Sequence, residues 1–157
     1  MEPKYVHTAI GVLGVVLKNS NQILLVLSKD RGWEPPQGFL EAGEAPVPAL
    51  HREVLEETGY TIRIRTLTGI YHCLSNGIPI ISICFLCEAC ERVTTKVEES
   101  VAVKWVDKEN LGNFITHESH LMRVMDALSG QISVSDYRLH PFGLIRSTRF
   151  PSHQDNS

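Results

Sequence analysis

Acidic side chains crowd into one short segment between positions 38 and 60, at spacings that suit metal chemistry. At about 3.6 residues per turn, Glu53, Glu56 and Glu57 would fall on one face of a helix, within an arc of about 100°. Carboxylates this close repel one another, and bound Mg²⁺ or Mn²⁺ would remove that penalty because both ions accept oxygen ligands. The segment is therefore predicted to bind a divalent cation for phosphate chemistry.

The fixed positions follow the pattern Gly-x5-Glu-x7-Arg-Glu-U-x-Glu-Glu-x-Gly-U, where U is a bulky apolar residue. The pattern begins at Gly38, includes Glu44 and Arg52, and ends at Gly59 and Tyr60. It closely resembles the signature of the Nudix hydrolases. Tyr60 departs from the Ile, Leu or Val that is usual there, but an aromatic ring can fill the same core pocket.

This resemblance implies a fold and a reaction. The expected fold is of class α/β: the Nudix α/β/α sandwich, with a central mixed β-sheet and a loop-helix-loop metal site. The expected enzyme is a pyrophosphohydrolase that uses Mg²⁺, or Mn²⁺ instead, to cleave the diphosphate linkage of an ADP-ribose-like or related nucleotide. Two alternatives stay open, a nucleoside-triphosphate pyrophosphatase acting on oxidised dGTP and a nucleotide-binding sensor without catalysis.

The resemblance also implies roles for the motif residues. Glu53, Glu56 and Glu57 would be metal ligands, joined by the carbonyl oxygen of Gly38. Arg52 would serve the catalytic site by orienting one carboxylate through a bidentate contact. The alternative for Arg52 is a solvated surface charge.

The general base has several candidates. Some Nudix enzymes take it from the helix, which here means Glu53, and others from a downstream loop, which here means Glu98 or Glu99. Glu99 lies six residues before Trp105, where related chains often carry an acid. Ala102 occupies another position at which an acid is common. The alternative for Glu98 and Glu99 is ordinary solvation of a loop.

Three aromatic side chains near the motif, Trp33, Phe39 and Tyr71, could stack against a nucleotide base. Core or loop packing is the alternative for each of them. The histidines lack the mutual spacing of a zinc site, and we expect surface or satisfied core positions for His7, His51, His72, His117 and His120.

Hydrophobic periodicity and turn signals predict the elements that position these residues. Strands are expected at 6–18 and 23–27, a Pro-rich irregular loop at 33–38, further strands at 62–71, 80–89 and 101–106, and a second helix at 117–129. The apolar face of this second helix is expected to contain Leu121, Val124, Met125 and Leu128. The range 135–150 receives no assignment.

The motif helix is predicted from Val47 to Thr58. Pro46 suits its first turn, and Gly59 suits its C-terminal cap. Glu44 is expected to be structural and to tie the preceding loop to the helix. The inward stripe is expected to contain Val47, Leu50, Val54 and Thr58.

Three cysteines share the spacing Cys-x2-Cys-x2-Cys at Cys84, Cys87 and Cys90. Their surroundings are rich in strand formers and lack the Gly or Pro of a metal knuckle. On a strand Cys87 would face away from the other two. These cysteines are therefore expected to be small buried residues rather than metal ligands.

The 157 residues, 43% of them hydrophobic, predict one domain at 1–150 and a polar tail at 151–157. With a net charge of −3 and no run of basic residues, a small nucleotide is a better partner than a long nucleic acid. The chain shows no signal-peptide layout and no apolar run long enough for a membrane span, so we expect no membrane partner and a cytoplasmic location. The resemblance is compatible with a homodimer.

Overall fold

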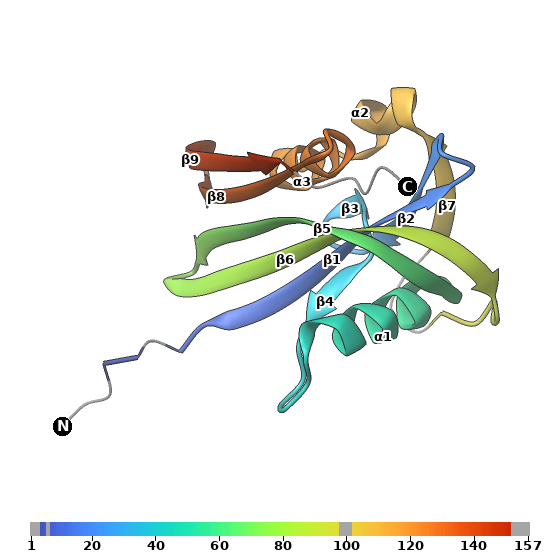
Figure 1. Ribbon diagram of the computed structural model, residues 1–157, viewed down its shortest axis with the longest axis horizontal. Helices are drawn as coiled ribbons and strands as arrows, with labels where there is room; N and C mark the ends of the chain where they lie inside the picture. Colours follow the sequence, from blue (N-terminus) through green and yellow to red (C-terminus); the bar gives the residue numbers. More distant parts are fainter. Residues whose placement is uncertain (1–3, 6, 98–101, 152–157) are drawn as a thin grey trace.

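The computed structural model describes residues 4–5, 7–97 and 102–151 of the chain. In chain order its main elements are β1 (Ala9–Lys18), β2 (Gln22–Ser28), β3 (Gly32–Glu34), β4 (Gln37–Phe39), α1 (Pro46–Thr58), β5 (Tyr60–Ser75), β6 (Ile78–Arg92), β7 (Ala102–Asp107), α2 (Leu111–Phe114), α3 (Glu118–Leu128), β8 (Gln131–Leu139) and β9 (Phe142–Pro151). The strands join into one sheet with the order β3-β2-β1-β6-β5-β8-β9, while β4 pairs with β1 and β7 pairs with β2 (Figure 1).

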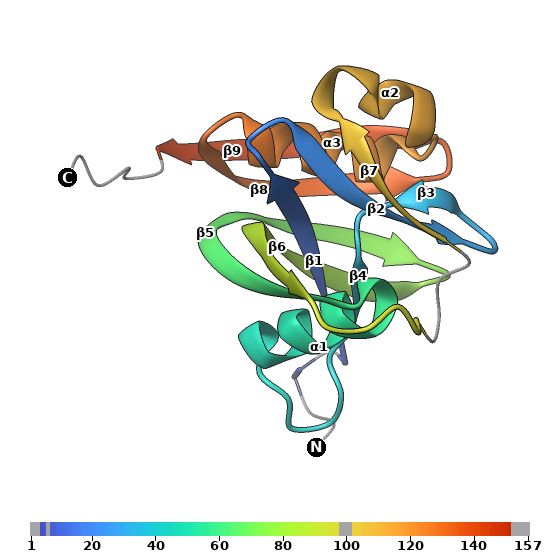
Figure 2. The ribbon, with the colours of Figure 1, turned by 90° about the vertical axis from the view of Figure 1, so that its right-hand side faces the viewer.

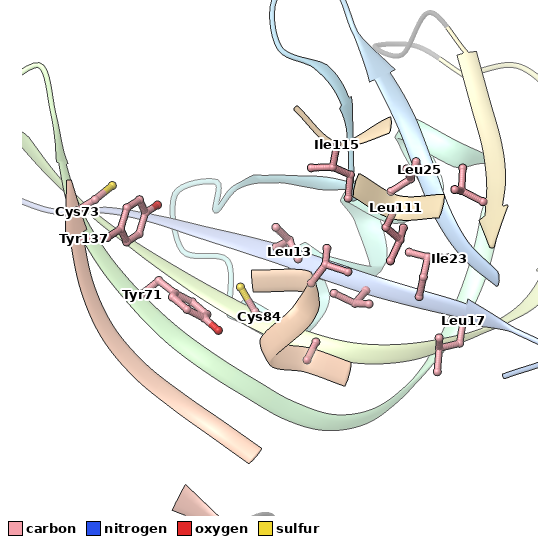
Figure 3. Close-up of a cluster of buried hydrophobic side chains, with 14 residues drawn as sticks. Leu13, Leu17, Ile23, Leu25, Tyr71, Cys73, Cys84, Leu111, Ile115 and Tyr137 are labelled. Carbon is pink, nitrogen blue, oxygen red and sulfur yellow. The ribbon is translucent and has the colours of Figure 1, made fainter. Parts of the chain in front are cut away.

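Each face of this sheet carries its own apolar core and its own helical cover. On one face, Leu50 and Val54 of α1 pack with Phe85 of β6. On the other face, Leu111 of α2 and Val124 of α3 belong to a second cluster, shown in Figure 3. Figures 1 and 2 show α1 on one side of the sheet and both later helices on the other.

The sheet is mixed, as predicted. β1 runs parallel to β6, and β5 runs parallel to β8, whereas the long β5–β6 pair is antiparallel. The predicted α/β/α arrangement is therefore confirmed. Among the described residues, no helix is both long and apolar enough to cross a lipid bilayer.

Most predicted elements are present with small shifts at their ends. The strand expected at 6–18 begins at Ala9, and the strand expected at 101–106 begins at Ala102. The helix expected at 117–129 lies between cap residues at those two positions. Val6 and Val101 lie outside the described residues.

The Pro-rich segment 33–38 was expected to be irregular, and that prediction is wrong. It contains parts of two short strands, β3 and β4, which pair with β2 and β1. Pro36 separates them, and its carbonyl oxygen accepts a hydrogen bond from the Gly14 amide at 3.0 Å. The β4 pairing places Gly38 opposite Val12. The strand therefore fixes the position of the first motif glycine.

Two side chains expected in the helix cores are exposed. Val47 is 45% exposed and Met125 is 54% exposed. On α1 the inward stripe contains Ala49 instead of Val47, beside the predicted Leu50, Val54 and Thr58. Val47 lies in the first turn of α1, at the edge of its buried face. Met125 lies opposite the buried face of α3, which carries polar residues such as His120, Arg123 and Asp126, so hydrophobicity alone indicates the wrong face there.

The unassigned range 135–150 belongs to a C-terminal hairpin of β8 and β9. β8 pairs with β5, with Val134 opposite Ile70, and β9 forms the outer edge of the sheet. Leu144, Ile145 and Phe150 of β9 are exposed. Because β9 buries no continuous face, its sequence carries no clear period-2 signal. β9 includes Pro151, the first residue of the expected polar tail.

The cysteines of β6 follow the expected alternation. Cys84 belongs to the cluster beneath α3, and Cys87 belongs to the cluster beneath α1. Cys90 is exposed, so the expected burial is wrong for this residue. The reason is that β6 continues beyond the core, where Glu91 and Arg92 are exposed too.

The end of α1 depends on Gly59. This residue has a φ of 77°, donates its N–H to the Leu55 carbonyl oxygen at 2.8 Å, and accepts the Val93 N–H at 2.9 Å. A Cβ added here would overlap the Thr94 carbonyl oxygen. Only glycine fits both the left-handed backbone and this close approach.

We expect Gly59→Ala to lower the free energy of unfolding by about 3 kcal/mol or more, because left-handed strain adds to a backbone clash. Gly43→Ala is the matched control, since Gly43 has a φ of 78° but open space around its Cα. The control should lose only about 1 kcal/mol. Urea denaturation measures both, and equal losses would contradict the clash.

Candidate active site

A cavity of about 1060 Å³ lies between α1, β4, the start of α3 and the β8–β9 hairpin. The motif contributes Glu53, Glu57 and Gly38 to its wall. Arg31 and Arg123 also line it, from the β2–β3 connection and from α3. The fold thus places carboxylates and guanidinium groups around one space, which suits an anionic ligand held together with a cation.

Glu53 lies directly against the backbone of Gly38. The side chain is buried, and a Cβ added at Gly38 would overlap the Glu53 carboxylate. The pairing of β4 with β1 holds Gly38 in place from the other side. A glycine is therefore required here for close approach of strand and carboxylate, rather than for a special backbone angle.

Arg52 connects three motif glutamates. Its Nε and Nη2 donate to the two oxygens of Glu44, each at 2.8 Å. Its Nη1 donates to Glu53 at 2.8 Å and to Glu56 at 3.2 Å, and Nη2 also donates to the Phe39 carbonyl oxygen at 3.1 Å. The bidentate contact expected of Arg52 is thus with Glu44, while the ligand candidates receive single bonds.

The ion pair with Arg52 sets the protonation of Glu44. The hydrogen bonds from Arg52, supported by the Glu41 amide at 2.9 Å, lower the pKa of Glu44 to about 2. In return, the bond to Glu44 raises the pKa of Arg52. Glu44 therefore stays ionised and ties the loop to α1, as its expected structural role requires.

Glu57 is held from the side of β4. The backbone N–H of Gln37 donates to its Oε2 at 2.9 Å, and the side chain is buried. Glu53 and Glu57 are thus oriented from opposite directions, one by Arg52 and one by the strand. This arrangement leaves two buried carboxylates facing the same cavity.

Arg31 is anchored by a buried acid. Its Nε and Nη2 donate to the two oxygens of Glu34 at 2.9 and 2.7 Å, and Glu34 is 1% exposed. The hydrogen bond to Glu34 raises the pKa of Arg31, and the charge of Glu57 adds to this effect. A bidentate pair restricts the guanidinium to one orientation, so Arg31 is pre-organised at the cavity wall.

His120 is a buried neutral side chain between these groups. Its Nε2 lies 3.1 Å from the side-chain Nε2 of Gln37. Its Nδ1 lies 3.4 Å from Oε2 of Glu34 but forms no hydrogen bond with it. Burial lowers the pKa of His120 to about 2, and the charges of Arg123 and Arg31 reinforce the effect. Glu34 does not reverse it because that carboxylate is already paired with Arg31.

The three aromatic candidates for base stacking lie in different surroundings. Phe39 lines the cavity and is 56% exposed. Trp33 packs edge-on against Phe114 at 6.1 Å between ring centroids. Tyr71 is 1% exposed and donates its hydroxyl to Asp126 at 2.8 Å, so it lies within the core cluster of Figure 3. Trp33 and Tyr71 thus follow the alternative of packing against the core, and neither belongs to the cavity wall.

Other predicted site residues are less central or lie outside the description. Glu56 is half-exposed and is not part of the cavity wall. Glu98 and Glu99, the loop candidates for the general base, lie outside the described residues. Within the described ranges, no three His, Cys, Asp or Glu side chains gather tightly enough to hold a metal by themselves. Further oxygen donors would be needed to complete an ion's coordination.

Four buried or anchored residues of the cavity region escaped sequence reasoning: Arg31, Glu34, His120 and Arg123. One signal was available for Glu34: a charged residue between Trp33 and Pro35, in a short segment, can indicate a buried acid with a specific partner. His120 and Arg123 are three residues apart on a helix whose apolar stripe includes Val124. Both side chains are buried, and the amino-acid composition alone does not indicate this.

The comparisons with known proteins agree with the motif. The family model named NUDIX domain matches residues 7–128. A MutT-like protein of Streptomyces ambofaciens is 34% identical over 123 residues, which covers 78% of each chain. A NUDIX hydrolase structure from Nitrosomonas europaea has a TM-score of 0.70 and 28% identity, covering 79% of this chain and 90% of that one.

Two shorter matches carry more specific names. An ADP-ribose pyrophosphatase of Methanocaldococcus jannaschii is 38% identical over 71 residues, 43% of this chain and 41% of that protein. A putative 8-oxo-dGTP diphosphatase of Bacillus subtilis is 44% identical over 62 residues, 39% of this chain and 42% of that protein. These matches span less than half of either relative.

The ion pair of Glu44 predicts a pH dependence. Because its folded pKa lies below its ordinary value of 4.5, Glu44 stabilises the fold above about pH 4.5, and this stabilisation is lost as the pH falls towards 2. Glu44→Gln should therefore be less stable than the wild type at pH 7, and the gap should narrow over that acid range.

Urea denaturation from pH 7 to pH 2.5 at low salt checks this expectation. Glu41→Gln is the control, since Glu41 is 73% exposed and lies 4.0 Å from Arg52. It should match the wild type closely. A Glu44→Gln gap that stays constant with pH would show that the ion pair is not its source.

Proposed function

The chain belongs to the Nudix family of hydrolases, and we propose that it cleaves the diphosphate linkage of an ADP-ribose-like nucleotide in a Mg²⁺-dependent reaction. The observation that carries the proposal is the burial of Glu53 and Glu57 at the wall of one cavity, each oriented by a separate group. The ADP-ribose pyrophosphatase among its relatives supports the substrate class. We propose the same single domain, at 1–150, as the catalytic unit.

The donors at this wall fit a hard divalent cation. Glu53, Glu57 and the Gly38 carbonyl are oxygen donors, and the missing Cβ of Gly38 leaves the room that the Glu53 carboxylate occupies. Glu56, at the half-exposed edge of α1, would complete the set. When bound, Mg²⁺ supplies positive charge that neutralises diphosphate oxygens and favours ionisation of a water molecule.

The residues around Glu53 and Glu57 fix the orientation of these two carboxylates. Arg52 orients Glu53 through a hydrogen bond, while its bidentate bond to Glu44 prevents Arg52 from turning towards the substrate. The Gln37 amide does the same for Glu57. Because both carboxylates are fixed before the ligand arrives, little reorganisation is needed at the moment of reaction.

Removal of a proton from water requires a base. Glu53 is one candidate, with a buried carboxylate at the cavity, and Glu98 and Glu99 are the others. Glu53 would act as base only while it is not shielded by a cation. The assignment among the three stays a proposal that separate variants would resolve through the pH dependence of kcat.

The remaining wall supports recognition of a nucleotide. Arg31 offers a fixed cation near Glu57, suited to a phosphate oxygen, and Phe39 offers an exposed ring for a base. The alternative substrate is oxidised dGTP, cleaved as a nucleoside triphosphate, and the putative 8-oxo-dGTP diphosphatase relative supports it. Both substrates present a diphosphate to the same carboxylates.

A substrate panel tests the proposal. With Mg²⁺, we expect the protein to release a nucleoside monophosphate from at least one of ADP-ribose, dinucleoside polyphosphates, NADH, nucleotide sugars, dNTPs and oxidised dGTP. Chelation by EDTA should stop the reaction. Inactivity across the panel would contradict the enzyme proposal and favour a nucleotide sensor, while the preferred compound would decide between the two substrate classes.

We expect Glu57→Gln to lower kcat by about 100-fold or more while the protein keeps its fold, because one charged oxygen donor is lost. Glu109→Gln is the control, since Glu109 is exposed and lies away from the cavity wall. It should retain wild-type activity. Near-normal turnover in Glu57→Gln, measured on the best substrate of the panel, would refute the role of this carboxylate.

Gly38→Ala tests geometry with every charge retained. The added methyl would displace the Glu53 carboxylate, so kcat should fall by about 10-fold or more. Gly112→Ala is the control because open space surrounds Gly112. A Gly38→Ala enzyme as active as this control would mean that the position of Glu53 against β4 is unimportant.

A further inference from the structure

A buried guanidinium in α3 has no acidic partner among the residues that the structure describes. Arg123 is 4% exposed, yet it lines the cavity. Its Nε donates to the Ser119 carbonyl oxygen at 3.1 Å. Across residues 4–5, 7–97 and 102–151, no carboxylate oxygen lies within 4.0 Å of it. A buried charge without a counter-ion costs several kcal/mol, so its presence requires a reason.

The nearby acids are already engaged. Asp126, one turn further along α3, accepts the Tyr71 hydroxyl at 2.8 Å and an Arg149 nitrogen at 3.0 Å. Glu34, across the cavity wall, is held by both nitrogens of Arg31. Neither acid can turn to Arg123 without breaking a buried interaction.

The other neighbours of Arg123 are uncharged near neutral pH. Burial raises the pKa of the Cys84 thiol to about 11, even though Arg123 opposes the shift. Burial likewise raises the pKa of Tyr137 to about 12, and it lowers the pKa of His120 to about 2. Figure 3 shows Cys84 and Tyr137 in the same core cluster. The charge of Arg123 is thus left for a ligand in the cavity.

We propose that Arg123 binds a phosphate group of the nucleotide substrate, in a subsite that the C-terminal hairpin closes. This inference rests on the proposed function and names a second contact of the same site. The bond to Ser119 directs the side chain back along α3 towards its first turn. Thr116 and His117, which precede α3, and Glu118 and Ser119 of its first turn also line the cavity. The backbone N–H groups at the start of a helix favour an anion, although the carboxylate of Glu118 opposes part of this effect.

The hairpin gives this subsite a wall that lies outside the residues matched by the family model. The family model ends at residue 128, whereas β8 and β9 follow it. Tyr137, Leu139 and Phe142 of the hairpin line the cavity, and the rings of Tyr137 and Phe142 lie 6.1 Å apart. An apolar wall beside a buried cation lowers the local dielectric and strengthens binding of an anion. The hairpin thereby ties substrate preference to a segment outside the common domain.

Thermal unfolding in EDTA tests the subsite without metal or turnover. We expect inorganic pyrophosphate and AMP to raise the melting temperature of the wild type, and adenosine to have no effect, since only the first two carry phosphate. Arg123→Met should weaken the response to both anions strongly, with Arg31 left as the other cation of the cavity wall. Arg146→Met, which removes an exposed arginine of β9, should retain it.

The ligand-free melting temperature separates binding from a structural role. Arg123→Met should equal or exceed the wild type, because it removes an uncompensated buried charge and keeps the side-chain volume. A loss of more than about 4 °C would overturn the proposal by showing that Arg123 supports the fold. Absence of a wild-type phosphate response, or an undiminished response in Arg123→Met, would overturn it as well.

Kinetics on the best substrate supply a second readout. We expect KM to rise by about 10- to 100-fold in Arg123→Met, with a smaller change in kcat, and Arg123→Lys to recover part of the loss because it keeps the charge. Unchanged KM in an active Arg123→Met enzyme would refute the subsite and leave the hydrolase proposal standing. An inactive wild type that still shows the Arg123-dependent phosphate response would refute the reaction and leave the subsite standing.

Discussion

The contact of Arg52 with the glutamates around it is the interaction on which the motif helix depends. One guanidinium donates hydrogen bonds to Glu44, Glu53 and Glu56, so the mutual repulsion of these carboxylates is reduced. The same contact ties the loop before α1 to the helix. Because the fork of Arg52 is committed to Glu44, the single bond to Glu53 orients that carboxylate without enclosing it. Stability of the loop and readiness of the site therefore come from one side chain.

Close packing between α1 and the sheet gives this arrangement its accuracy. Leu50 and Val54 press against Gly14 of β1, where an added Cβ would meet them at 3.2 and 3.4 Å. On the neighbouring strand β4, Gly38 is in close contact with the carboxylate of Glu53. Two glycines on paired strands thus let the helix approach closely enough for its acidic edge to reach the cavity. The apolar stripe and the acidic edge are positioned by the same contact.

The opposite wall of the cavity follows a different principle. There, a buried polar layer links the core to the site: Tyr71 and Arg149 satisfy Asp126, and Glu34 satisfies Arg31. Arg123 alone in this group lacks an acidic partner among the described residues. If Arg123 binds a phosphate as proposed, the cost of burying this charge would be offset when the anionic ligand binds.

The sequence by itself determined the family, the mixed α/β fold, the motif helix to within one residue at its start and the cap of that helix at Gly59, because spacing along a helix and the chemistry of turns are local properties. Only the tertiary structure decided which groups share the cavity. Tyr71 lies in the core, and Arg31 and Arg123 lie at the cavity wall. The C-terminal hairpin also emerges only from the structure, because its exposed strand β9 has no periodic hydrophobic pattern. Contacts between distant segments depend on register and burial, and neither is written in the order of residues within one segment.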